Sequence, residues 1–343
     1  MSAAPLTHRV RAERSQRGWS QAELAQRSGL SRAEISALET GRLASPSTSA
    51  ALRLAAAFNL TVEDLFSLAD PSVDVEWAWA PPREGARSWL AEVEGRPLRY
   101  PCEPTLRGAV SADGPALSAP PRRTVVIAGC DPAIGILAAD VERSSGVRVL
   151  ALTRSSRTSL QLLASGAVHM AGVHLGPNAS AARRALGRDQ AVLTHVATWE
   201  AGLALAPSAR IKSVRAALRS RLRWVARAEG SGARRCLDCV IAAEVSERPP
   251  RLDHVARDHL GVAATIQSGW AQLGPCLRLV ADEAGLGFLS IEQQAYDLVT
   301  RASLVNDPAV AAVLASLRSR RLRLALSGLS GYDPSRAGTE QRS

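Results

Sequence analysis

Two helix-start signals lie only eleven residues apart near the N-terminus. Residues 20–23 read SQAE and residues 31–34 read SRAE, and a serine three residues before a glutamate is the pattern of a capping box. Between them, Gly29 can adopt the left-handed conformation that ends a helix. The spacing leaves room for one helix over 21–27, a tight turn at 28–30 and a second helix. It therefore predicts a helix-turn-helix.

The second helix has two distinct faces. Ile35 and Leu38 are expected to face inward, together with Leu24, Ala25 and Leu30 of the preceding helix and turn. The outward positions are Arg32, Ala33, Ser36, Ala37 and Thr40. This set is small and polar, as an element that enters a DNA groove requires.

The string SQAELAQRSGLSRAEISALETGR at 20–42 closely resembles the Xre-type, phage-repressor/Cro-like DNA-binding domain. The similarity continues through Pro46 and through helices expected at 49–58 and 62–66, and it covers residues 6–68. It implies that double-stranded DNA is a partner, that Gln21 and Arg42 contact the DNA backbone, and that Arg32 reaches a guanine edge. The implied DNA-binding residues are Gln21, Ser31, Arg32, Ala33, Ser36, Ala37, Thr40 and Arg42.

The positive charge of the chain is not concentrated in this domain. Lys and Arg exceed Asp and Glu by 42 − 32 = 10 over the chain, whereas residues 1–70 hold eight arginines and seven acidic residues, a net charge of +1. Phosphate neutralisation supplies most non-specific affinity for DNA. A single domain should therefore bind a half-site weakly, and we expect a homodimer that binds two half-sites.

A segment rich in Pro, Gly and Trp follows, over residues 70–123. This proline density excludes long helices. Short strands are expected at 74–79, 87–93 and 96–100, with turns at Gly95 and at 113–114. We interpret the segment as a small β-module, with a plain linker as the alternative.

From residue 124 onward, apolar strands alternate with helices. Strands are expected at 124–128, 148–152 and 168–175, with helices at 131–144 and 158–164. A second series follows, with a strand at 222–226, helices at 233–244 and 252–267, and a strand at 287–291, while residues 195–205 and 277–283 are expected to connect two lobes. This alternation predicts a bilobal α/β domain with a crevice at the strand ends.

Four strings in this region carry a second resemblance. They are AGCDPAIG at 128–135, HMAGVHL at 169–175, EGSGAR at 229–234 and YDL at 296–298. They resemble cytoplasmic relatives of periplasmic binding proteins, in particular the molybdate-binding-protein-like domain that is fused behind Xre-type helix-turn-helices. The resemblance covers residues 122–325 and implies a clamshell that closes on a small ligand.

Candidate ligand-binding residues gather at three expected helix N-termini, whose amides and hydroxyls suit an anion, and His174 ends the third strand at the same edge of the crevice. The set is Cys130, Asp131, Ser155, Ser156, His174, Ser231, Gly232 and Arg234, with Arg157 and Arg235 as further sources of positive charge. Asp131, Ser156 and Ser231 have an alternative role as plain helix caps. The helix N-termini favour an oxyanion such as molybdate as the effector. Because the Asp131 carboxylate would repel molybdate or sulfate, a polar organic metabolite with an amine or several hydroxyls is an equal alternative.

Other signals in the sequence point away from membranes, metals and catalysis. No apolar run is long enough to span a bilayer, and the chain is expected in the cytoplasm. Cys236 and Cys239 have zinc-ligand spacing but no second pair nearby, so no metal or cofactor is expected. The sequence lacks the Gly-x-Ser-x-Gly, Walker and Rossmann motifs, so we do not expect an enzyme.

The sequence thus predicts a multidomain chain. It has an all-α helix-turn-helix bundle over 1–70, a small β-module or linker over 71–122, a bilobal α/β ligand-sensing domain over 123–328 and a disordered tail over 329–343. The predicted function is a one-component transcription regulator whose affinity for DNA is modulated by a small ligand. The alternatives are a cytoplasmic small-ligand-binding protein that uses the helix-turn-helix for protein contacts, and an enzyme on the same α/β scaffold.

Overall fold

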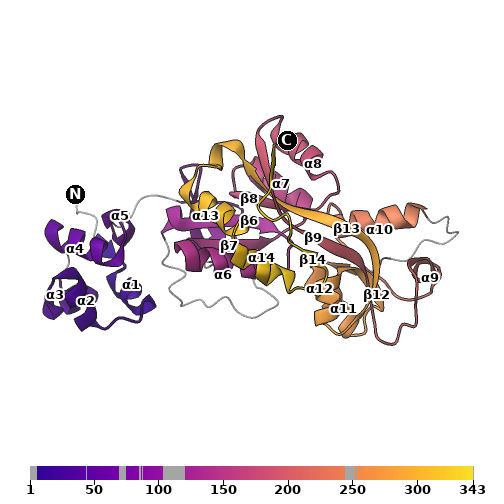
Figure 1. Cartoon of the computed structure of the whole chain (residues 1–343), viewed down its shortest axis with the longest axis horizontal. Coiled ribbons are helices and arrows are strands. Elements are labelled where there is room, and N and C mark those ends of the chain that lie inside the picture. Colours follow the sequence, from indigo (N-terminus) through magenta and orange to yellow (C-terminus); the bar gives the residue numbers. More distant parts are fainter. Residues whose placement is uncertain are drawn as a thin grey trace. The chain divides into compact units, whose positions relative to one another are not determined.

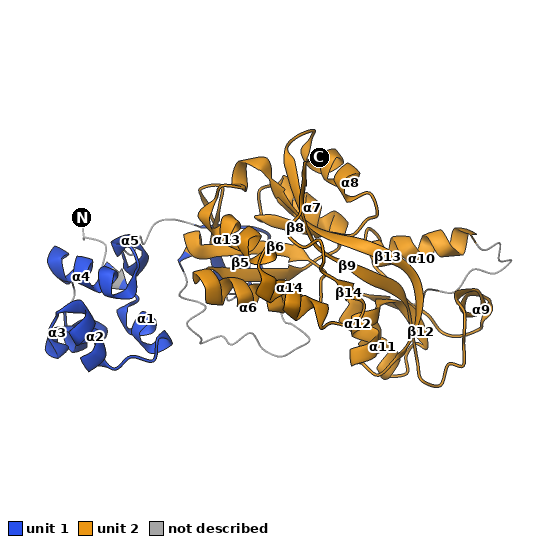
Figure 2. Cartoon of the chain, viewed as in Figure 1, with its two compact units in different colours: residues 1–90, 99–120 blue, residues 91–98, 121–343 orange. Residues whose placement is uncertain are grey.

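A computed structural model describes residues 6–342 except residues 44, 69–74, 85, 87, 103–119, 244–251 and 253. The chain divides into two compact units (Figure 2). The first comprises residues 1–90 and 99–120, and the second comprises residues 91–98 and 121–343. Among the described residues, no helix has both the length and the apolar composition needed to cross a membrane.

Five helices and a short ribbon form the described N-terminal bundle (Figure 1). The helices are α1 (Val10–Gln16), α2 (Gln21–Ser28), α3 (Arg32–Glu39), α4 (Thr48–Phe58) and α5 (Val62–Leu65), and β1 (Leu6–His8) pairs antiparallel with β2 (Phe66–Leu68). Each helix contributes buried apolar side chains to one core, among them Val10, Leu24, Ile35, Leu54 and Leu65. The predicted helix-turn-helix is confirmed at α2 and α3.

The segment after the bundle contains a three-stranded sheet in its described part. Its strands are β3 (Glu76–Trp77), β4 (Ser88–Val93) and β5 (Arg96–Pro101), in the order β3-β5-β4. Glu94 and Gly95 connect β4 to β5 with φ angles of 51° and 76°, so the turn expected at Gly95 is confirmed, as are the three strands. The turn expected at 113–114 lies outside the described residues.

The first lobe of the α/β domain is built from alternating strands and helices. These are β6 (Thr124–Gly129), α6 (Ile134–Ser145), β7 (Arg148–Thr153), α7 (Ser156–Ala164), β8 (Met170–Val173) and α8 (Asn178–Leu186), later joined by α13 (Pro308–Leu317) and α14 (Arg320–Ser327). The strand β6 pairs in parallel with both β7 and β8. The carboxyl ends of these three strands therefore lie at one edge of the sheet, as the sequence predicts.

The second lobe has its own apolar clusters. Its elements are α9 (Val214–Arg219), β10 (Val225–Arg227), α10 (Gly232–Ala243), β11 (His254–Ala256), α11 (His259–Gln267), β12 (Leu273–Leu277) and α12 (Arg278–Glu283). The continuous helix predicted over 252–267 is wrong, because residues 254–256 form a strand parallel to β10. The segment predicted to connect the lobes at 277–283 is also wrong, because it ends β12 and then forms α12.

Two long strands run through both lobes (Figure 1). They are β9 (Ala191–Leu205) and β13 (Gly287–Arg301), which pair antiparallel along nearly their whole length. Six strands of the eight-stranded sheet follow the order β12-β9-β13-β8-β6-β7, and the other two pair with β9 beside this path. The second half of β9 pairs with β12 of the second lobe. The first half pairs with the part of β13 that lies beside β8 of the first lobe. The connection predicted over 195–205 is therefore confirmed, whereas β13 extends ten residues beyond the strand predicted at 287–291.

The C-terminal segment is ordered to residue 342, and the disordered tail predicted over 329–343 is wrong for its described part. β14 (Tyr332–Asp333) and β15 (Glu340–Arg342) both pair antiparallel with β9. The side chain of Tyr332 is buried in the core of the first lobe. This polar segment is ordered because its backbone pairs with the otherwise open edge of β9 and because the Tyr332 ring packs in the core.

Candidate functional site

The helix-turn-helix is set by local capping. Ser20 and Ser31 each accept a hydrogen bond from the backbone amide of a glutamate three residues later, and that glutamate in turn accepts from the serine amide. These are the two capping boxes that the sequence predicts. Gly29 ends α2 with a φ of 68°, which an L side chain would adopt only with strain. The turn between the two helices is thus fixed by its own residues.

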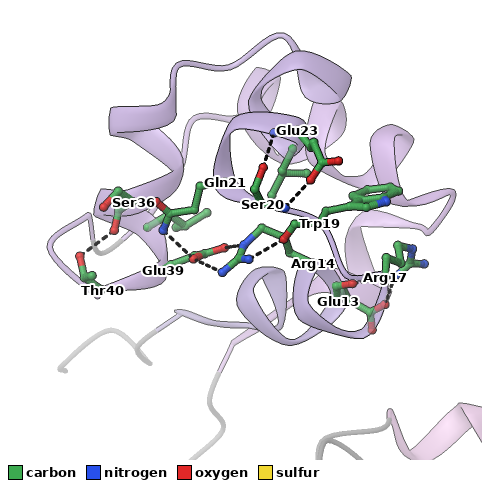
Figure 3. Close-up of polar contacts among 12 residues, drawn as sticks. Glu13, Arg14, Arg17, Trp19, Ser20, Gln21, Glu23, Ser36, Glu39 and Thr40 are labelled. Carbon is green, nitrogen blue, oxygen red and sulfur yellow. Dashed lines mark hydrogen bonds and ion pairs between the residues drawn. The ribbon is translucent and has the colours of Figure 1, made fainter.

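A buried ion pair joins three helices of the bundle (Figure 3). The Arg14 guanidinium donates to both carboxylate oxygens of Glu39, with Nε to Oε1 at 2.6 Å and Nη2 to Oε2 at 2.9 Å. Gln21 Nε2 donates to Glu39 Oε2 at 2.9 Å. Burial opposes the charge of Glu39, but the hydrogen bonds from Arg14 and Gln21 prevail, and the pKa of Glu39 is lowered. The network fixes α3 against α1 and the start of α2.

The two predicted DNA-binding residues at the start of α3 lie on the side of the helix away from the core. Arg32 and Ala33 are exposed, while Ile35 and Leu38 are buried. The Arg32 side chain makes no hydrogen bond or ion pair with any described residue. The helix therefore presents a free guanidinium next to a methyl group at its N-terminal turn.

The remaining predicted residues of this surface are partly engaged within the domain. Ser36 and Ala37 are half-buried, and the Thr40 hydroxyl donates to the Ser36 carbonyl oxygen at 2.7 Å. Arg42 Nε donates to Thr40 Oγ1 at 3.2 Å. Gln21 keeps one of its two amide hydrogens free, because an amide nitrogen carries two.

In the α/β domain, the ends of β6 and β8 bring Cys130 and His174 together. The distance from Cys130 Sγ to His174 Nε2 is 3.1 Å, and both side chains are buried. Gly232 of the second lobe lies against His174, since a Cβ at residue 232 would be 2.3 Å from His174 Nδ1. Burial raises the pKa of the Cys130 thiol to about 11 and lowers that of His174 to about 4. Both groups are therefore neutral near pH 7.

Two buried residues that the sequence analysis missed lie in the second lobe. Arg227 ends β10 and is fully buried, and its Nε and Nη1 have no hydrogen-bond partner among the described residues. His259 begins α11, and neither of its ring nitrogens has such a partner. Buried polar groups are normally satisfied. Unpartnered donors at this point of the fold therefore indicate a ligand site.

These residues lie where the two lobes meet. The Arg157 amide of the first lobe donates to the Gly230 carbonyl oxygen of the second at 3.3 Å, and Arg257 Nη2 donates to the Thr153 carbonyl oxygen at 3.4 Å. His259 joins Cys130 and His174 in a group whose possible ligand atoms all lie within 4.8 Å of one another. This is the one place, among the described residues, where three such side chains are close enough to share a metal ion.

Three predicted ligand residues are engaged by hydrogen bonds within the first lobe, and only Ser155 among them caps a helix. Ser155 Oγ accepts from the Thr158 amide at the start of α7, and Ser156 Oγ accepts from the His174 amide at 3.2 Å. Asp131 Oδ1 accepts from the Ala133 amide at 2.9 Å and from the Tyr332 hydroxyl at 2.7 Å. One oxygen of Asp131 is thereby held by the first lobe, and burial raises the pKa of this carboxyl to about 6.

Ser231 and Arg234 line a separate pocket between α7, α8 and α10. Its volume is about 870 Å³, within the range of small-molecule sites. The charged lining comprises Arg157, Arg184, Arg234, Arg235, Glu229 and Asp238. Arg234 pairs with Asp238 at 2.8 Å, whereas Arg157 and Arg184 pair with no acid among the described residues. The pocket therefore carries an excess of positive charge.

Comparison with known proteins gives two family matches. The model of the PBP superfamily domain matches residues 138–318, and a helix-turn-helix model matches residues 10–65. An uncharacterized protein in the ferredoxin 2Fe-2S gene 5' region of Clostridium pasteurianum is 29% identical over 98 residues, which is 26% of this chain and 83% of that protein.

Solved structures are similar at low sequence identity. One is a putative phosphate ABC transporter substrate-binding protein with bound phosphate from Clostridium perfringens, with a TM-score of 0.49, 10% identity, and coverage of 60% of this chain and 97% of that chain. Another is the tungstate ABC transporter from Geobacter sulfurreducens, with a TM-score of 0.48, 12% identity, and coverage of 60% and 98%.

Proposed function

We propose that this chain, which belongs to the PBP superfamily, is a one-component transcription regulator whose affinity for its DNA operator is set by a small effector. A helix-turn-helix domain joined to a PBP domain supports a ligand-responsive DNA-binding regulator in general, rather than an enzyme. We place the protein in the cytoplasm and propose that it binds DNA as a homodimer, because one domain of net charge +1 gains little affinity from phosphates alone.

The observation that carries the DNA-binding proposal is the exposed face of α3. The Arg14 to Glu39 pair holds this helix rigidly from its buried side, while Arg32 and Ala33 remain exposed. A free arginine suits the O6 and N7 acceptors of guanine, and an alanine methyl suits a thymine methyl group. We propose the full predicted set as the DNA interface, with Gln21 and Arg42 on the backbone.

Replacing Arg32 by alanine should weaken specific binding by roughly 1–3 kcal/mol and relax the preference at one base position. Replacing Gln21 by alanine should weaken binding to all sequences alike, because a phosphate contact carries no sequence information. Operators can be selected from a random duplex library with the wild-type protein and then titrated at fixed salt with each variant. An unchanged base preference in Arg32→Ala would refute the assignment, and failure of the wild type to select any sequence would favour the protein-contact alternative.

For the effector we propose the pocket between α7, α8 and α10. Ser231 and Arg234 come from the second lobe and Arg157 from the first, so a ligand there contacts both lobes and favours their closed arrangement. The excess of arginine favours an acidic ligand. An oxyanion such as molybdate and an acidic polar metabolite both meet this requirement. Among the other predicted residues, Cys130, His174 and Gly232 lie together outside this pocket.

Replacing Ser231 and Arg234 together by alanine should abolish the effector response and leave effector-free DNA binding nearly unchanged. A ligand transmits only its differential affinity for the two arrangements, and such coupling is typically about 1–3 kcal/mol, or roughly 5- to 150-fold in operator affinity. Operator affinity would be measured with and without molybdate, phosphate and a cell-metabolite extract. The matched control is the pair Ser213→Ala and Arg219→Ala on α9, outside this pocket. Equal responses in the wild type and the Ser231 and Arg234 double variant would exclude the pocket.

A further inference from the structure

We propose that Cys130, His174 and His259 form a binding site for one soft monovalent metal ion, for which Cu(I) is the probe. Their ligand atoms lie within 4.8 Å of one another and all three side chains are buried. Two of the residues follow strands β6 and β8 of the first lobe, and the third begins α11 of the second. An ion held by all three would tie the lobes together. The site is separate from the effector pocket and does not depend on it.

His174 is already oriented as a metal ligand. Gln294 Nε2 donates to Glu292 Oε1 at 2.6 Å, so the amide oxygen Oε1 of Gln294 is the atom that lies 2.9 Å from His174 Nδ1. That oxygen can only accept, so Nδ1 carries the hydrogen and Nε2 carries the lone pair. Nε2 is the atom 3.1 Å from Cys130 Sγ. A carbonyl acceptor behind a ligating imidazole is the usual outer support of a metal site.

The buried and unpartnered imidazole of His259 is an independent indication of a ligand at this position. It is 1% exposed, and both of its ring nitrogens lack a hydrogen-bond partner among the described residues. An imidazole without any partner in a buried position costs free energy. A coordinate bond from one of these nitrogens removes that cost. Together with a thiol and a prepared imidazole, it gives a three-ligand set of the soft and borderline donors that Cu(I) prefers.

The buried positive charge of Arg227 favours a monovalent ion over a divalent one at this site. Arg227 is fully buried and its guanidinium charge lies near both His174 and His259, so the cluster resists additional positive charge. A monovalent ion replaces the thiol proton, which leaves to solvent, and the charge of the cluster stays unchanged. A divalent ion would add one positive charge beside Arg227. The metal-bound thiolate would also accept from the unpartnered N–H groups of Arg227, as hydrogen bonds to a ligating sulfur do.

The test is anaerobic titration of the full chain with Cu(I) against a chromophoric Cu(I) chelator. The exposed Cys239 and the half-buried Cys102 are first replaced by serine, so that neither competes. We expect one Cu(I) per chain, and X-ray absorption should show one sulfur and two nitrogen ligands. Cys130→Ser should lower the affinity by more than about 100-fold and Gln294→Ala by about 10- to 100-fold. Cys236→Ala, a buried cysteine outside the group, should leave it unchanged.

Several results would overturn the proposal. They are absence of stoichiometric Cu(I) binding, a site with two or more sulfur ligands, and undiminished affinity in Cys130→Ser. Tighter binding of Zn(II) than of Cu(I) at the same residues would overturn the charge argument. If Cys130→Ser does not fold, as judged by circular dichroism, His259→Gln replaces it and should lower the affinity by the same order.

Discussion

Replacing Arg14 by alanine should lower the free energy of unfolding of the N-terminal bundle by about 3–5 kcal/mol. The Glu39 side chain is 3% exposed and the Arg14 side chain 15%. The variant therefore leaves a carboxylate that keeps the Gln21 hydrogen bond and the weaker influence of the Arg11 charge but loses its ion-pair partner. Hydrogen exchange of amides in α2 and α3 measures this locally in the full chain. Protection there should fall by roughly two to four orders of magnitude.

A double-mutant cycle separates the buried charge from lost packing. Adding Glu39→Gln to Arg14→Ala removes the orphaned charge, so the double variant should be more stable than Arg14→Ala alone. Gln16→Ala, at an exposed position of the same helix, should change protection little. If the two single effects at Arg14 and Glu39 simply add, the ion pair does not hold the three helices together.

Local signals in the sequence account for what could be predicted. The capping boxes at Ser20 and Ser31 and the left-handed Gly29 act within a few residues of themselves, so their geometry follows from their order in the chain. The first strands and helices of the α/β domain were predicted for the same reason, since each is a short apolar or amphipathic segment bounded by turn residues. Such features need no knowledge of distant partners.

Elements defined by distant pairing were the ones missed or shortened. β11 is three residues long and exists because β10 lies beside it, while a helix pattern continues through its sequence. The full length of β13 depends on its register with β9, and the ordered C-terminal segment depends on the same strand. None of these partners can be identified from the local sequence.

The candidate sites divide in the same way. Ser231 and Arg234 were predicted from a glycine-rich helix start, a local motif. Arg227 and His259 belong to no motif, and each is an ordinary residue in its own segment. The one available signal was an arginine directly after the apolar run at 224–226, because an arginine at the end of a buried strand needs a partner. Only the fold places that guanidinium beside Cys130 and His174.

Replacing Asp131 by asparagine should stabilise the second unit by about 2–3 kcal/mol at pH 7.5. The carboxyl has a pKa of about 6 in the folded protein, raised by burial against the hydrogen bonds from Tyr332 and Ala133, compared with about 3.9 in an unfolded chain. Between these two values the folded state binds more protons than the unfolded state. The wild type therefore loses stability as the pH rises from about 4 to 6, and the loss is complete above that range.

The asparagine variant lacks this titration but keeps an oxygen that can accept from the Tyr332 hydroxyl. Its advantage over the wild type should shrink by about 2 kcal/mol between pH 7.5 and pH 4.5, measured by urea unfolding at each pH. Asp333→Asn is the matched control, because hydrogen bonds from the backbone and side chain of Ser335 lower the pKa of that exposed carboxyl, so its replacement should not stabilise the protein at pH 7.5. An Asp131→Asn advantage that is the same at every pH would show that the Asp131 carboxyl does not titrate in this range, and that packing or hydrogen bonding causes the difference.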